Sequence, residues 1–335
     1  MTLQELLDLA RERIAVDDDE LDEAKRRREL VAAALRREFG GRIYFNGSIA
    51  HGDANDPLTD FDLGVVIPND DGEYGPGARS ARSLQERARD AIKRELKDEF
   101  PDLRVEIDGR KRSVLVRFSA SISDRAGDFT GDIIVAIEHE EVGLWIPRYD
   151  SWDRSHPEMH TALILAAIAA TQVVIARTNR LLKHWSIRHD SPLCAWHIKA
   201  LNLGAVGCPM PLADALESFF AHAYEDLGEG DTADPAGVGP DIKPRVSRSH
   251  ARDHVRAGLE LVRAAKAAEN DGKPVLAQAK LATLLPDIVD SPADEDVAAE
   301  EREWEIARLK AAGNLVGVGT ATKLSLPNTR GWRIG

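Results

Sequence analysis

Hydrophobic and polar positions divide the chain into a first part rich in short strands and a second part of long helices. Apolar residues at helical spacing predict helices over 3–38 and 80–99. Short apolar runs predict strands over 42–46, 61–67, 103–108, 113–122 and 130–138. Longer helical patterns, separated by turn residues, follow over 157–187, 194–206, 211–226, 248–271 and 273–285. We predict an α+β fold, with a mixed sheet in the N-terminal half, a helical C-terminal half and an active site in the cleft between them.

The character of the chain changes near residue 150, and this change sets the expected domain organisation. Residues 1–150, including the N-terminal helix, are expected to form the half that contains the sheet. Residues 151–312 are expected to form the helical half, in which the acidic segment 287–303 is predicted to be a solvated helix. Residues 313–335 are expected to be a C-terminal tail.

Two aspartates at the start of an apolar strand, Asp60 and Asp62 in FNGSIAHGDANDPLTDFDLGVVI (45–67), give the first indication of chemistry. Residues two apart on a strand point to the same face, so these carboxylates project together. Two such charges repel each other and resist burial, and no lysine or arginine lies nearby in the sequence. A divalent metal ion is the more natural partner, because Mg²⁺ binds carboxylate oxygens and substrate phosphates together.

A third carboxylate would complete a site for two metal ions, which clamp the attacking and leaving oxygens in phosphoryl chemistry. The candidate is Asp132, which starts the apolar strand TGDIIVAIE much as Asp62 starts its own. If the two strands are neighbours, Asp132 can join the pair and act as a base toward a hydroxyl. Glu106 and Asp128 are alternatives, and Asp132 is favoured by its glycine and β-branched neighbours.

Gly47 and Ser48 provide a candidate phosphate-binding turn. Glycine lets the backbone approach a phosphate closely, and N–H groups at a helix start bind anions. The Ser48 hydroxyl adds a further donor. A Gly-Ser pair alone is a common turn, but here both it and the Asp-x-Asp pattern are flanked by strands, and together they predict a phosphate-binding turn beside a metal site.

Charge and composition restrict the function classes. The net charge of −13 argues against broad, tight nucleic-acid binding, although a metal ion would still permit small anionic ligands. The basic cluster 25–28 is interpreted first as a solvated helix face and second as a phosphate-facing patch. No apolar run reaches the roughly 18 residues of a membrane span, and the start lacks a signal-peptide core, so we expect a soluble, cytoplasmic protein. Cys194 and Cys208 are expected to be free thiols, because a zinc site built on them and His197 would lack a fourth ligand.

These residues resemble a known pattern. Gly47-Ser48, Asp60-x-Asp62 and Asp132 look like the motif of the polymerase-β-type nucleotidyltransferase superfamily. The stretches SWDRSHPEMH (151–160), RTNRLLKHW (177–185) and LCAWHIKAL (193–201) resemble the helical half of the bacterial cyclic-oligonucleotide synthases (CD-NTases) and the oligoadenylate synthases. The resemblance covers about residues 45–285.

The resemblance implies a role for each matched residue. Asp60, Asp62 and Asp132 would bind two Mg²⁺ or Mn²⁺ ions, and Asp132 would also help to activate the acceptor hydroxyl. Gly47 and Ser48 would hold the donor triphosphate. Lys183 would neutralise phosphate, its alternative being a solvated helix lysine. The remaining aromatic and imidazole side chains near these motifs are expected to be core aromatics or ordinary polar contacts, namely Trp185, Trp196, His51, His184 and His197.

The sequence also departs from the family pattern at three positions. Gly52-Asp53 stands where Gly-Thr is frequent, Ala136 where a proline is frequent, and Ala195 where a serine is frequent. None of these departures removes a metal ligand. They leave the choice of nucleotides open.

The implied function is a metal-dependent nucleotidyltransferase that makes a cyclic di- or oligonucleotide second messenger from nucleoside triphosphates, in bacterial anti-phage (CBASS-type) signalling. A downstream effector would bind the product rather than this chain. Gly335 would suit an E1/E2-like conjugation partner, because a terminal glycine has no side chain to hinder thioester formation. Two alternatives stay open: transfer to an RNA end or a protein acceptor, of the toxin or tRNA-modifying type, with 25–28 and 245–256 as basic candidates, and a non-catalytic nucleotide-binding scaffold.

Overall fold

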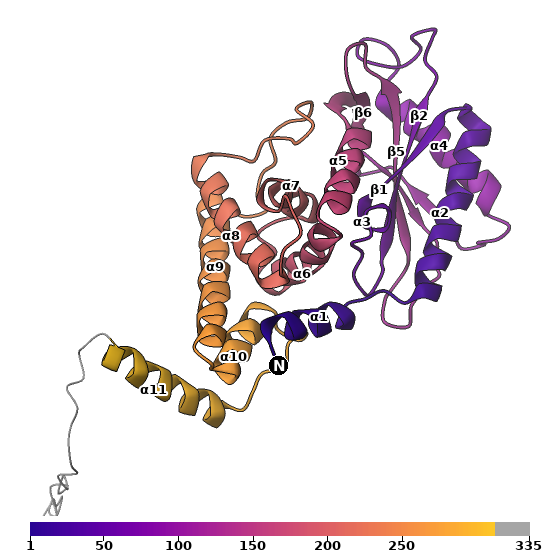
Figure 1. The fold of residues 1–335 in the computed structure, drawn as a ribbon. Helices are drawn as coiled ribbons and strands as arrows, with labels where there is room; N and C mark the ends of the chain where they lie inside the picture. Colours follow the sequence, from indigo (N-terminus) through magenta and orange to yellow (C-terminus); the bar gives the residue numbers. More distant parts are fainter. Residues whose placement is uncertain (312–335) are drawn as a thin grey trace, which may run out of the picture.

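A computed structural model describes residues 1–311 of the chain, and in it a sheet-containing half lies beside a helical half (Figure 1). The predicted tail, 313–335, and Gly335 with it lie outside the described residues. The two halves are in contact through α5 (Pro157–Ala170), which packs against strand β1 (Arg42–Asn46) on one side and helices of the second half on the other.

One mixed, seven-stranded sheet forms the centre of the first half. The remaining strands are β2 (Asp60–Ile67), β3 (Arg104–Glu106), β4 (Val114–Arg117), β5 (Thr130–Glu138), β6 (Leu144–Arg148) and β7 (Ser151–Ser155). The main path runs β1-β2-β5-β4-β3, with β6 paired to the end of β5 and β7 paired to β6. β2 and β5 are parallel, and the other pairs are antiparallel. The expected mixed sheet is confirmed.

Two helices, α2 (Asp18–Phe39) and α4 (Ala81–Leu96), cover the sheet face that points away from the helical half (Figure 1). Their buried apolar residues, among them Leu35 and Leu84, pack on the inward-facing side chains of β2 and β5 to form one core. This burial follows from the helical spacing of apolar positions. The opposite sheet face carries a smaller core that includes Tyr44, Val66 and Ala136, and the end of that face where Asp60, Asp62 and Asp132 lie points toward the second half.

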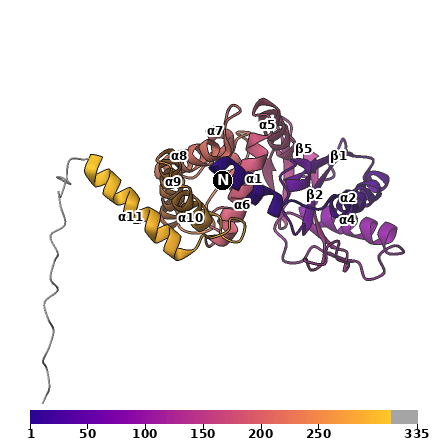
Figure 2. The same cartoon turned by 60° about the horizontal axis from the view of Figure 1, so that its bottom comes forward.

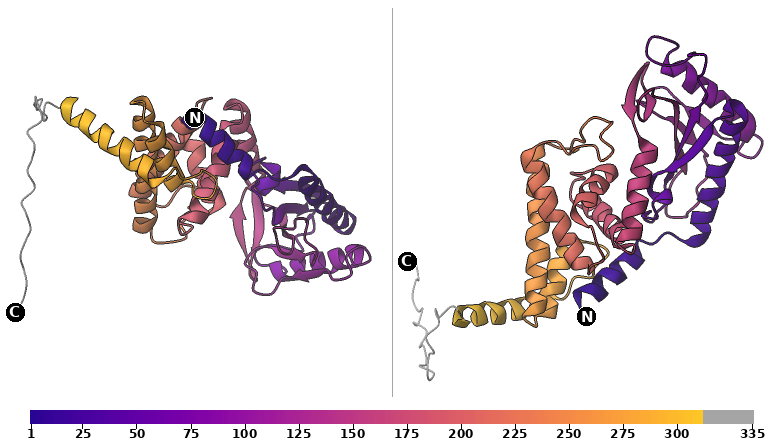
Figure 3. Two further views of the ribbon diagram at one scale, coloured as in Figure 1. Left: turned by 90° about the horizontal axis from the view of Figure 1, so that it is seen from below. Right: turned by 45° about the horizontal axis from the view of Figure 1, so that its top comes forward.

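The helical half is built from α6 (Val174–Arg188), α7 (Ala195–Ala205), α8 (Leu212–Glu229), α9 (Arg248–Asn270) and α10 (Pro274–Leu284). Their apolar faces share a second core that includes Trp185, Phe219 and Phe220. A last helix, α11 (Asp294–Ala311), projects beyond α10, as the turned views show (Figures 2 and 3). The described part of α11 has few buried residues, in agreement with the predicted solvated acidic helix.

The first predicted helix, 3–38, is two helices rather than one. α1 (Leu3–Arg13) ends before Asp17, whose side chain caps α2 by accepting a hydrogen bond from the Asp19 N–H at 2.9 Å. The buried side chains of α1, such as Leu7, belong to the core of the helical half. The chain therefore begins in the second half and crosses to the first at residues 14–17 (Figure 1).

The predicted helix 157–187 is also two helices, α5 and α6, whose axes differ by 114°. Gln172 and Val173, between them, have φ values of 49° and 66°. A right-handed helix cannot continue through these angles. The β6–β7 hairpin was not predicted as strands, and the sheet extends to Ser155, beyond residue 150.

Within residues 1–311, no single helix is long and apolar enough to cross a membrane. The bent pair of α5 and α6 passes the test of length and composition only when the two helices are taken together.

Candidate active site

The strand register places the predicted carboxylates side by side. β2 and β5 are paired in parallel with Asp62 opposite Asp132, so both side chains leave the same face of the sheet. The neighbours of these aspartates along the strands, Phe61 before Asp62 and Ile133 after Asp132, point to the other face and are buried in the core below α2 and α4. Because side chains alternate along a strand, the apolar neighbours of the aspartates are buried in the core. The carboxylates themselves face the helical half.

Gly47, at the end of the adjacent strand β1, lies close to the Asp62 carboxylate. β1 leads into the short helix α3 (Gly47–Ala50), and the Asn46 side chain accepts a hydrogen bond from the Gly47 N–H at 2.7 Å. Gly47 has a φ of 76°, and a Cβ added there would overlap the Asp62 Oδ2 atom. Glycine is thus required both by the backbone angle and by the close approach of Asp62.

A cavity of about 660 Å³ lies over these residues, and both halves contribute to its walls. The sheet half provides Gly47, Ser48, Asp60 and Asp62, and the helical half provides Lys183, Trp196, Lys199 and Arg245. The predicted cleft is present. A smaller cavity of about 180 Å³ adjoins it and is lined by Asp62, Asp132, Arg112 and Ser113, among others.

The charges of Asp60 and Asp62 are poorly compensated. Burial, followed by the charges of Asp60 and Asp132, raises the pKa of Asp62 to about 7. Burial and the charge of Asp132 also raise the pKa of Asp60, and Lys183 offsets only part of this effect. A positive partner would therefore favour the ionised form of Asp62 and, in the same direction, that of Asp60.

Two lysines from the helical half converge on Asp53, which is fully buried beside the cleft. Lys183 Nζ donates to the Asp53 backbone oxygen, and its distance to Asp53 Oδ1 is 3.4 Å. Lys199 Nζ lies 3.0 Å from the same Oδ1 atom and 2.8 Å from Nδ1 of His51. Burial lowers the pKa of Lys183 to about 8, although Asp53 raises it in part. Lys183 is thus a buried cation in the cleft and not a solvated helix lysine.

Asp132 is held by its own partners. Arg110 Nη2 donates to Asp132 Oδ1 at 2.6 Å, and the Ser113 hydroxyl donates to the same atom at 3.0 Å. Neither Asp60 nor Asp62 has an arginine partner in the described part of the chain. The third carboxylate is therefore near the pair but is engaged by Arg110.

Comparisons with known proteins extend these findings. No family model and no curated protein match the sequence. Among solved structures, CdnC of E. coli MS115-1, determined with ATP, has a TM-score of 0.64 at 16% identity over 87% of this chain and 99% of its own. The DncV cyclic AMP-GMP synthase of Vibrio cholerae has a TM-score of 0.61 at 13% identity, over 83% of this chain and 93% of DncV. The CdnE cyclic dinucleotide synthase of Elizabethkingia meningoseptica, determined with GTP and Apcpp, has a TM-score of 0.55 at 17% identity. The match covers 76% of this chain and 97% of CdnE.

The chain has the cyclic-dinucleotide-synthase fold. The resemblance drawn from a few motifs is confirmed at the level of the fold, over most of the described chain and nearly the whole of each solved structure. The α+β class and the cleft between the halves of this fold are confirmed with it.

The donor set in the cleft of this fold fits a hard divalent cation. Asp60, Asp62 and Asp132 offer only carboxylate oxygens, which are the ligands that Mg²⁺ and Mn²⁺ prefer. Burial, followed by the charges of Asp60 and Asp132, raises the pKa of Asp62, so a bound cation would favour its ionised form. Asp132 would have to exchange Arg110 for the ion.

The other residues singled out from the sequence have different surroundings. Trp185 is a core residue, as predicted. Trp196 is half-buried, lines the cleft and lies against the His160 ring at a centroid distance of 4.4 Å, so its expected place in the core was wrong. The three histidines are polar contacts, as predicted, with partners Thr161 and Lys199 for His51, Pro286 for His184 and Thr232 for His197.

Sequence reasoning missed Asp53, Lys199 and Arg110. Lys199 is the one lysine in the apolar helix AWHIKALNLGA, and a lone charge there was a usable signal. Asp53 was noted only as a departure from the family pattern. Its role depends on contacts with residues 130 and 146 positions away, which no local pattern shows. Arg110 lies in a turn with no periodicity.

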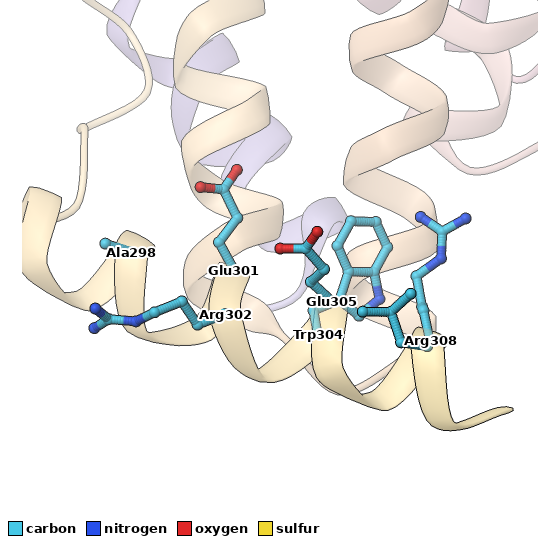
Figure 4. Close-up of a pocket in the computed structure, with 7 residues that line it drawn as sticks. Ala298, Glu301, Arg302, Trp304, Glu305 and Arg308 are labelled. Atoms are coloured by element: carbon cyan, nitrogen blue, oxygen red, sulfur yellow. The ribbon is translucent and has the colours of Figure 1, made fainter. Parts of the chain in front are cut away.

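A second cavity of about 660 Å³ lies far from this chemistry (Figure 4). All of its lining residues, such as Trp304 and Glu305, come from α11. A depression on one helix has no opposite wall, and it contains none of the carboxylates discussed above. We therefore assign the candidate active site to the cleft between the halves.

Proposed function

We propose that the protein is a metal-dependent nucleotidyltransferase that joins nucleoside triphosphates into a cyclic di- or oligonucleotide. The observation that carries this proposal is the register of Asp62 with Asp132, next to Asp60, on the sheet face that lines the cleft. The cleft holds Gly47 close to Asp62 and brings Lys183 and Lys199 from the opposite side. The shared fold with the DncV and CdnE synthases supports the cyclic product.

Each residue has a proposed task. Asp60, Asp62 and Asp132 would hold Mg²⁺ or Mn²⁺, two ions in the full site, which would supply charge stabilisation for phosphoryl transfer. Asp132, once free of Arg110, accepts the proton of the acceptor hydroxyl. Gly47 lets the backbone approach the donor triphosphate, and the N–H and hydroxyl of Ser48 bind it, because the Gly47 N–H already donates to Asn46.

The lysines act from the helical side. Lys183 lies at the cleft wall, where its charge offsets that of Asp60 and, in the complex, of a phosphate. Lys199 lies deeper and is bound to Asp53 and His51, so it holds the wall in place. Positioning and electrostatics are the main sources of acceleration in reactions of this kind.

The first experiment incubates the purified chain with all four labelled ribonucleoside triphosphates and Mg²⁺ or Mn²⁺, and resolves phosphatase-resistant products by chromatography and mass. A resistant product that Asp60→Asn and Asp62→Asn both lose supports the proposal. Asp70→Asn, which removes an exposed carboxylate in the loop after β2, should retain full activity.

Three other outcomes would contradict the proposed synthesis of a cyclic nucleotide in the cleft. A product that persists in Asp60→Asn/Asp62→Asn would place the chemistry elsewhere. If nucleotides alone give no product but label appears on added tRNA or on a protein in lysate, and only with intact Asp60 and Asp62, the acceptor is a macromolecule. Nucleotide binding without turnover under all of these conditions would indicate a scaffold.

The biological setting is a further part of the proposal. CdnC has been solved in a complex with a HORMA protein, so one protein of this fold has a protein partner. We place this chain in bacterial anti-phage signalling, where an effector binds its product and an E1/E2-like partner acts at Gly335. Cells that carry the wild type, Asp60→Asn/Asp62→Asn or a Gly335 deletion are challenged with phage to test the role in defence. The protein conjugates in the same cells are compared to test the E1/E2-like partner. An unchanged pattern of conjugates in the deletion removes the E1/E2-like partner.

A further inference from the structure

A group of three potential metal ligands lies on the helical half, apart from the cleft carboxylates. His250 and His254 are four residues apart on α9 and therefore share one face of the helix. Asp190 reaches them from the turn between α6 and α7. One ligand atom of each residue lies within 4.8 Å of the other two.

The distances are close to those that a tetrahedral ion requires. The Nε2 atoms of His250 and His254 are 3.0 Å apart, and His254 Nε2 lies 3.9 Å from Asp190 Oδ2. Two nitrogens bound to zinc at about 2.0–2.1 Å lie about 3.3 Å apart in tetrahedral geometry. The Asp190 side chain is 82% exposed, so it can move the remaining distance without disturbing the core.

We propose that His250, His254 and Asp190 form a binding site for a zinc-class transition-metal ion. Two imidazoles and a carboxylate suit Zn²⁺, whereas Mg²⁺ prefers oxygen ligands alone. The site is thus chemically distinct from the carboxylate cluster in the cleft. Three protein ligands leave one coordination position for water.

The ion would join the turn between α6 and α7 to α9, which follows the cleft residue Arg245. Asp190 belongs to the turn that connects α6, which carries Lys183, to α7, which carries Lys199. The Pro192 carbonyl in the same turn accepts a hydrogen bond from the Arg245 N–H at 3.0 Å, and the Arg245 side chain lines the cleft. A metal ion between Asp190 and α9 would add a second link to the one made by Pro192 and Arg245, and would hold the turn against the helical half. Its expected effect is to tie this turn to α9.

The test titrates tag-free, metal-free protein with Zn²⁺ in excess Mg²⁺, by calorimetry, and repeats the titration with Co²⁺ to record the visible spectrum of a nitrogen-ligated tetrahedral ion. One equivalent should bind, and Tm should rise by about 5 °C at a hundredfold excess over Kd. His250→Gln/His254→Gln should lose this binding, and Asp190→Asn should weaken it at least about tenfold.

Two controls keep the result specific. Asp253→Asn removes an exposed carboxylate next to His254, outside the cluster, and should bind Zn²⁺ like the wild type. Asp60→Asn/Asp62→Asn should also keep the site, so that a failure of the proposed nucleotidyl transfer does not affect this test. Equal Zn²⁺ affinity in folded His250→Gln/His254→Gln and in the wild type, or a Co²⁺ spectrum typical of oxygen ligands alone, would overturn the proposal.

Discussion

At the scale of single residues, the closest constraint in the site is between Gly47 and Asp62. A methyl group at Gly47 would overlap the Asp62 carboxylate, and Gly52, five residues later, also has a positive φ but open space around it. Gly47→Ala and Gly52→Ala should therefore each lose about 1 kcal/mol of stability through the backbone angle. Only Gly47→Ala also displaces Asp62, and it should lower the rate of product formation about 100-fold. Equal rates in the two variants would show that this contact has no bearing on catalysis.

The raised pKa of Asp62 leads to a prediction about stability in the absence of metal. Because the pKa is about 7 in the folded chain and 3.8 ordinarily, the folded state binds more protons between these values. Stability should therefore fall as the pH rises from about 4 to about 7. Asp62→Asn removes this penalty and should raise the free energy of unfolding at pH 8 by roughly 1–3 kcal/mol relative to wild type, with a smaller gain at pH 5. Urea denaturation in chelator at both pH values measures it.

The matched control for that experiment is Asp70→Asn, whose carboxylate is exposed. It changes the net charge by the same amount without relieving the cluster. If Asp70→Asn gives the same gain as Asp62→Asn, the effect is one of overall charge rather than of the site. Added Mg²⁺ should reduce the advantage of Asp62→Asn, since the ion supplies the missing positive charge to the wild type.

At the scale of elements, patterns within one segment were predictable and breaks between segments were not. Strand alternation was enough to place Asp60 and Asp62 on one face, because it depends only on neighbouring residues. The apolar pattern runs without a break through α5 and α6, so it does not indicate the bend between them. The two helices pack against different partners, α5 against the sheet and α6 against the helical core. The β6–β7 hairpin, which contains Pro147, lacks clear alternation. Asp53 and Lys199 needed the tertiary structure.

The α5–α6 bend is itself a place where sequence and conformation disagree. Val173 is β-branched, has a φ of 66° and is 41% exposed, so it bears backbone strain with little compensating burial. Val173→Gly should raise the free energy of unfolding by up to about 1 kcal/mol. Val142 is 52% exposed and has no positive φ, so Val142→Gly should lower stability by about 0.5–1 kcal/mol. Thermal unfolding of both variants tests the difference, and a loss in Val173→Gly equal to that in Val142→Gly would contradict it.

At the scale of the whole molecule, α1 connects the two halves. Its apolar face packs in the helical core, and the Ile14 carbonyl just after it accepts hydrogen bonds from Arg180 Nη2 at 2.7 Å and from the Asp56 N–H at 3.1 Å. Arg180 belongs to α6, whereas Asp56 precedes the strand that carries Asp60 and Asp62. The Ile14 carbonyl thus binds one residue of each half, and we expect its position to depend on the packing of α1.

Leu7, at the centre of the α1 face, has no exposed surface, whereas Leu9 on the same helix is 45% exposed. Leu7→Ala should therefore cost about 2–5 kcal/mol of stability, and Leu9→Ala should stay within about 0.5 kcal/mol of wild type. Because α1 also holds the Ile14 carbonyl between residues of the two halves, folded Leu7→Ala should turn over nucleotides more slowly at temperatures well below its Tm. Denaturation curves and rates measured together decide this. A loss of stability with an unchanged rate would restrict α1 to the core of the helical half and remove it from the alignment of the cleft.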